Sequence, residues 1–140
     1  MEELYSHVRG RSIPQSTFEQ LPTVLPSMAS RWDKPLGGVL RWVTLRVGRL
    51  TATSTSLHEW GREIEADGAE WWSEPAREQW ARELDALFFH LFGVPREDIS
   101  YVMDSFEIVR RRDEQAHREY RTKRLVLEAY DQLALFGPAS

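Results

Sequence analysis

The clearest pattern of apolar and polar positions lies just after the middle of the chain and has the period of an α-helix. Its apolar residues recur at intervals of three, four and one: Trp80, Leu84, Leu87, Phe88, Leu91 and Phe92. The segment Ser73-Glu74-Pro75 before them is typical of a helix start, and Gly93 is typical of a helix end. The pattern therefore predicts one continuous helix between these two signals.

Two further helices are predicted closer to the C-terminus. The first starts near residues 96–98 and has four apolar residues on its inner face: Ile99, Val102, Met103 and Phe106. The second runs from about residue 121 to residue 135 and has a buried stripe of five: Thr122, Val126, Ala129, Tyr130 and Leu133. We expect the core to form around seven side chains of these helices: Trp80, Leu84, Phe88, Val102, Phe106, Val126 and Tyr130.

The segment from Leu36 to Ile64 fits two patterns. Four apolar residues would share a helical face: Val39, Val43, Val47 and Leu50. A near alternation of apolar residues from 39 to 47 and frequent threonines would instead suit a strand. The pattern alone leaves the choice between helix and strand open.

The first 35 residues show no regular period. Four prolines are spaced so that no long helix fits between them: Pro14, Pro22, Pro26 and Pro35. We therefore predict a mainly α fold, a small domain of three to four helices in residues 36–140, preceded by an extended proline-rich arm in residues 1–35.

The composition narrows the class of protein. With 140 residues, of which 41% are hydrophobic, the chain can bury one core. The absence of cysteine excludes disulfides and thiolate metal sites and fits a reducing compartment. No stretch approaches the ~20 apolar residues that span a bilayer, and residues 1–12 lack the apolar core of a signal peptide. We expect a cytoplasmic protein without a membrane contact.

Charge is unevenly distributed, with a basic window between Arg110 and Arg124. The window carries a net charge of +4, although the whole chain carries −4. A basic island on an acidic body is typical of a surface that contacts phosphate, and an aromatic ring within it could stack on a base. The window supplies the candidate nucleic-acid-binding residues: Arg110, Arg111, Arg112, Arg118, Tyr120, Arg121, Lys123 and Arg124.

The same window also has a purely structural interpretation. Its cations would pair with four nearby acids and brace a loop between two helices, with the tyrosine packed beneath it: Asp113, Glu114, Glu119 and Glu128. Arg121 and Lys123 near a helix start oppose the helix dipole unless an anion lies nearby, which favours phosphate contact. Cations gathered on one exposed face would indicate DNA, whereas cations paired inward would indicate a brace.

Three segments of the chain resemble a known family. The run FEIVRRRDEQAHREYRTKRLVLEAYD, residues 106–131, is similar to the C-terminal end of the large adenine-specific DNA methyltransferases of type IIG restriction-modification enzymes and of related phage-defence (BREX- or DISARM-like) systems. That family typically closes with DTFPIVRRKDE, a spacer and EYRTKRLILEAYD. ELDALFFHLFGVPREDISYVMDSF, residues 83–106, and STFEQLPTVLP, residues 16–26, also resemble family segments. The resemblance covers about residues 12–133, but only the tail of such an enzyme.

The resemblance implies a helix in residues 36–64 and a module without its own catalysis. The family needs a glycine-containing cofactor turn and an NPPY-type motif. Neither occurs here, and the chain contains no asparagine. We therefore expect no enzyme activity and no cofactor. The expected function is a DNA-contacting or specificity-associated module of a restriction-modification or phage-defence system; the alternative is docking on a methylase or other defence subunit without touching nucleic acid.

The sequence departs from the family pattern in the basic window. Glu107 stands where proline is usual, and His117-Arg118 replaces a pair that ends in glycine. Upstream, Glu19 replaces a frequent lysine. The charge at Arg118 puts the shape of the loop in question, because glycine normally allows a tight bend there.

Other candidate sites have weaker patterns. Glu63, Glu65 and Asp67 lack the lysine and strand of a nuclease site, and the four histidines are scattered, so we predict no catalytic and no metal site. The adjacent aromatic pairs Trp71-Trp72 and Phe88-Phe89 are more informative, because neighbours on a helix cannot both face one surface. We expect one member of each pair to contact another chain, either a methylase body or a second copy in a homo-oligomer.

Overall fold

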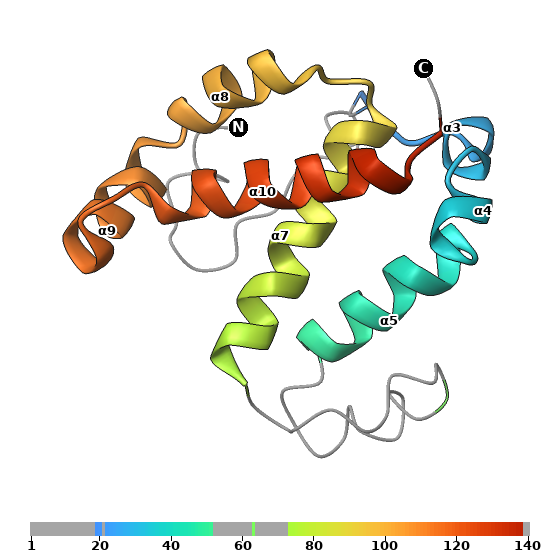
Figure 1. Ribbon diagram of the computed structural model, residues 1–140, viewed down its shortest axis with the longest axis horizontal. Helices are drawn as coiled ribbons and strands as arrows, with labels where there is room; N and C mark the ends of the chain where they lie inside the picture. Colours follow the sequence, from blue (N-terminus) through green and yellow to red (C-terminus); the bar gives the residue numbers. More distant parts are fainter. Residues whose placement is uncertain (1–18, 21, 52–62, 64–72, 139–140) are drawn as a thin grey trace.

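The computed structural model describes residues 19, 20, 22–51, 63 and 73–138. These residues form seven α-helices and no strand: α3 Pro26–Ser30, α4 Asp33–Leu36, α5 Val39–Thr51, α7 Glu74–Leu91, α8 Arg96–Asp104, α9 Glu107–His117 and α10 Arg121–Phe136 (Figure 1). The prediction of a mainly α fold is confirmed. The number of helices in the described part exceeds the predicted three to four.

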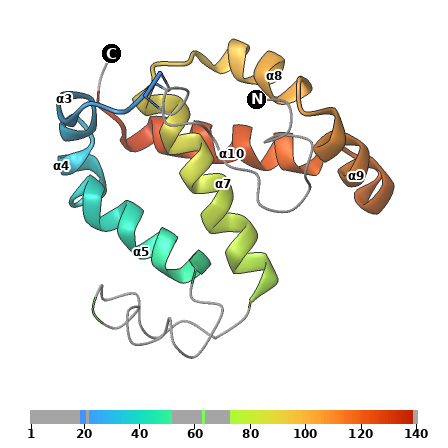
Figure 2. The same cartoon turned by 180° about the vertical axis from the view of Figure 1, so that it is seen from behind.

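Helices α7 and α10 cross at the centre and form the most extensive helix pair (Figures 1 and 2). Helix α5 packs on α7 at one side of this crossing. Helices α8 and α9 lead away from α7, and α10 then runs back alongside both of them. The chain therefore brings α10, its last helix, against three earlier ones.

The core consists of two clusters of buried side chains. The first lies where α3 to α5 meet α7 and the end of α10: Trp32, Val39, Ala86, Leu87, Leu91 and Leu133. The second lies between α8 and the first half of α10: Ile99, Met103 and Val126. Helix α10 contributes to both clusters, since Val126 and Leu133 lie two turns apart on one face.

Local signals set the ends of α7 as predicted. The Ser73 side chain accepts a hydrogen bond from the backbone N–H of Ala76, and a proline occupies the first turn. Gly93 follows the helix with a φ of 66°, the left-handed conformation that glycine adopts without strain. These caps explain why α7 begins and ends where the sequence indicated.

The buried face of α7 differs from the expectation. Leu87 is fully buried, whereas Phe88 and Phe92 are each 40% exposed. Phe106, another predicted core residue, is 51% exposed, while Val126 is buried as predicted. The apolar stripe of α7 is wider than the surface that α10 and α5 cover, so its edge stays open.

Helix α5 resolves the choice between helix and strand in favour of helix for residues 39–51. Its first N–H, that of Val39, donates to the Asp33 carboxylate at 3.0 Å. At its other end, the Arg77 guanidinium on α7 donates to the carbonyls of Arg49 and Leu50 at 3.1 and 2.7 Å. Both helix ends are thus satisfied by side chains outside α5.

The predicted extended arm is wrong for its last described part. Residues 22–25 have no regular structure, but residues 26–30 and 33–36 form α3 and α4. Pro26 stands in the first turn of α3, where a missing N–H has no consequence. Trp32, between the two helices, belongs to the core at 5% exposure. The division into residues 1–35 and 36–140 stays a prediction.

The difference between Leu87 and Phe88 gives a stability test. We expect Leu87→Ala to lower the free energy of unfolding by roughly 2–5 kcal/mol, since it leaves a cavity in a closed cluster. Phe88→Ala removes a larger side chain from a half-open site and should cost clearly less. Urea denaturation followed by circular dichroism measures both, and equal losses would contradict the assigned faces.

Candidate functional site

The eight predicted nucleic-acid-binding residues surround the corner between α9 and α10. Arg110, Arg111 and Arg112 lie on α9, so the predicted loop over this part of the window is wrong and helix replaces it. Arg118 lies in the loop between the two helices, and Tyr120 directly precedes α10. The first turn of α10 carries the remaining three residues: Arg121, Lys123 and Arg124.

Four of the seven cations in the window are paired with carboxylates. Arg121 on α10 contacts Glu78 on α7 at 2.7 Å, and Lys123 contacts Asp104 at the end of α8 at 2.8 Å. The other two form local pairs: Arg110 with Glu114, and Arg124 with Glu119 and Glu128. The pairs of Arg121 and Lys123 join α10 to two other helices, which is the arrangement expected of a brace.

In the exposed pair of Arg124 and Glu119, each group shifts the pKa of the other so that both charged forms are favoured. Hydrogen bonds to Glu119 and Glu128 raise the pKa of Arg124 above its ordinary value. The hydrogen bond from Arg124 in turn lowers the pKa of Glu119. Both groups therefore stay charged at neutral pH, and because they face solvent their pairing adds little to stability.

Tyr120 packs beneath the corner. Its hydroxyl donates to the carbonyl of Met103 at 2.8 Å, and its ring lies against the cluster of Ile99, Met103 and Val126. Burial raises the pKa of the hydroxyl. Because both its hydroxyl and its ring contact other parts of the chain, Tyr120 favours the structural interpretation of the window.

The start of α10 has an internal anion. The Asp113 carboxylate on α9 accepts a hydrogen bond from the backbone N–H of Thr122, in the first turn of α10. The two cations there, Arg121 and Lys123, suggested from sequence that an anion lies nearby, and Asp113 meets that requirement within the chain. A bound phosphate is not needed to explain them.

The remaining cations of the window are Arg111, Arg112 and Arg118. All three are exposed, and none makes an ion pair with another described residue. Arg118 has a φ of 64° and is the one non-glycine residue of the described chain in the left-handed region. The chain thus makes this bend without glycine, at the cost of backbone strain.

An apolar groove of about 410 Å³ opens beside this corner, between α7, the end of α8 and the start of α9. Ten residues line it: Arg82, Asp85, Phe88, Phe89, Phe92, Met103, Phe106, Val109, Tyr120 and Thr122. Phe88, Phe92, Phe106 and Val109 are exposed, between 37 and 51%. We call this surface the apolar groove.

The members of the aromatic pair Phe88-Phe89 face different surfaces, as expected from sequence, and the expected contact of one of them with another chain stays a prediction. Phe89 packs against the cluster of Ile99, Met103 and Val126, whereas Phe88 points to the open side of the groove. The other pair, Trp71-Trp72, lies outside the described residues. What the sequence missed is that the C-terminal end of α8 and the start of α9 extend this surface with Phe106 and Val109.

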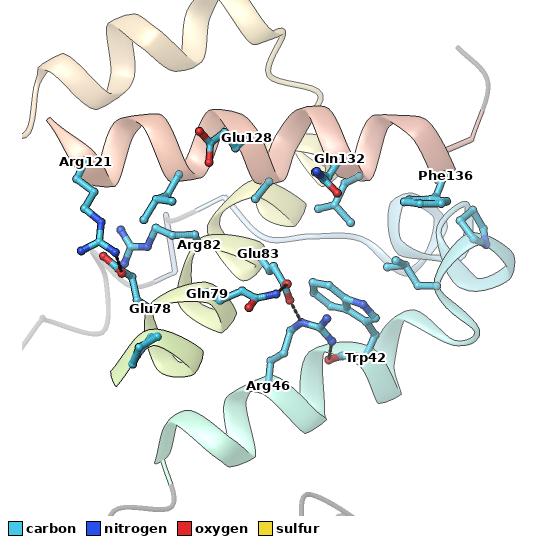
Figure 3. A pocket seen from close by; sticks show the side chains of 16 residues that line it. Trp42, Arg46, Glu78, Gln79, Arg82, Glu83, Arg121, Glu128, Gln132 and Phe136 are labelled. Carbon is cyan, nitrogen blue, oxygen red and sulfur yellow. Dashed lines mark hydrogen bonds and ion pairs between the residues drawn. The ribbon is translucent and has the colours of Figure 1, made fainter. Parts of the chain in front are cut away.

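A second hollow of about 570 Å³ lies between α5, α7 and α10 (Figure 3). Its charged groups are engaged with one another: Arg46 contacts Glu83 at 2.6 Å and stacks over the Trp42 ring at 3.3 Å, and Arg121 contacts Glu78. Burial lowers the pKa of Arg46 despite this pair. The size suits a ligand, but these pairs leave few polar groups directed at one.

No group of three histidines or acids within the described residues could hold a metal ion. Glu63 is exposed, and Glu65 and Asp67 lie outside the described residues. His90 stacks on Tyr130 with ring centroids 3.7 Å apart, and burial lowers the pKa of His90.

Among the described helices, none combines the length and apolar character needed to cross a membrane.

Comparison of the chain with protein-family models, with curated proteins and with solved structures found no match. The resemblance to adenine methyltransferases therefore stays a prediction from the motifs.

The left-handed Arg118 provides a test of this corner. We expect Arg118→Gly to raise the free energy of unfolding by about 1 kcal/mol, because glycine adopts this conformation without steric cost. The matched control is Arg118→Ala, which removes the charge but keeps the Cβ atom and should give no gain. Urea denaturation distinguishes them, and an equal gain in both variants would assign the effect to charge.

Proposed function

We propose that this chain is a non-catalytic docking module whose apolar groove binds another protein. By the motif resemblance, the partner is a methylase or another subunit of a restriction-modification or phage-defence system. The observation that carries the proposal is the group of half-exposed, adjacent side chains of Phe88, Phe92, Phe106 and Val109. Contiguous apolar surface of this kind marks interaction sites, and aromatic residues in pockets contribute most to protein binding.

The distribution of charge supports docking over DNA contact. Most cations of the basic window pair with acids of the same chain, and α9 itself carries three acids beside its three arginines: Glu107, Asp113 and Glu114. Within the described residues, this pairing leaves three of the seven cations of the window for contact with a phosphate backbone. The brace leaves the neighbouring groove as the surface open to a partner.

Photo-cross-linking in the source cells tests the docking proposal. A benzophenone amino acid placed at Val109, within the groove, should give an adduct that mass spectrometry identifies as a methylase or another defence subunit. The control position is Gln115, which is exposed on a different face of the same helix. Equal adducts from both positions, or an adduct only with proteins outside DNA modification and defence, would count against the proposal.

A second candidate function is direct DNA contact. Arg111, Arg112 and Arg118 favour it, because they are exposed and make no ion pair with another described residue. If they bind phosphate, a labelled duplex should bind at low salt, and the affinity should fall steeply as salt rises. Arg111→Gln, Arg112→Gln and Arg118→Gln together should then abolish binding while keeping the brace. Fluorescence anisotropy measures this, and the absence of binding at low salt would dismiss DNA contact by the isolated chain.

A further inference from the structure

We draw no further inference here: the strongest candidate, the apolar groove between α7, the end of α8 and the start of α9, adds nothing to the proposed docking function, because nothing in the structure shows what covers it.

Discussion

The packing of α10 across the other helices is the constraint on which the structure depends. Its single inner face supplies Leu133 to one core cluster and Val126 to the other, so neither cluster closes without it. Polar contacts hold it at the same position from three sides. The Tyr130 hydroxyl donates to the Val94 carbonyl at 2.9 Å, Arg96 pairs with Asp131 at 2.6 Å, and Asp113 caps the first turn.

This constraint explains why the cations at the corner between α9 and α10 fall into two groups. The cations that join α10 to its neighbours are engaged inside the chain, whereas the arginines of the outer face of α9 and of the turn make no ion pair with another described residue. A dense basic motif therefore combines cations that join helices with cations that are exposed. The apolar groove stays open, because α7 carries more apolar surface than α10 and α5 cover.

Much of the secondary structure followed from local signals in the sequence. The start of α7 depends on Ser73 and a proline, its end depends on Gly93, and α10 extends over almost the predicted range. Helix α9 was harder to predict from the sequence, because its charged segment has few apolar residues that could show a helical period and no buried residue. Asp113 joins this helix to α10, because its carboxylate accepts a hydrogen bond from the backbone N–H of Thr122. The sequence also located the basic window, whose role in binding stays a prediction, but it did not indicate the apolar groove near it.

The sequence by itself determined that the chain is helical, that it bears one basic window, and that one of two adjacent phenylalanines must face outward. These properties depend on residue type and on spacing along a helix, which are local. The tertiary structure decided that Leu87 is buried and Phe88 open, that Trp32 enters the core, and that Arg121 pairs with Glu78 on a distant helix. Such outcomes depend on which helix covers which face, and spacing within a single helix carries no information about that.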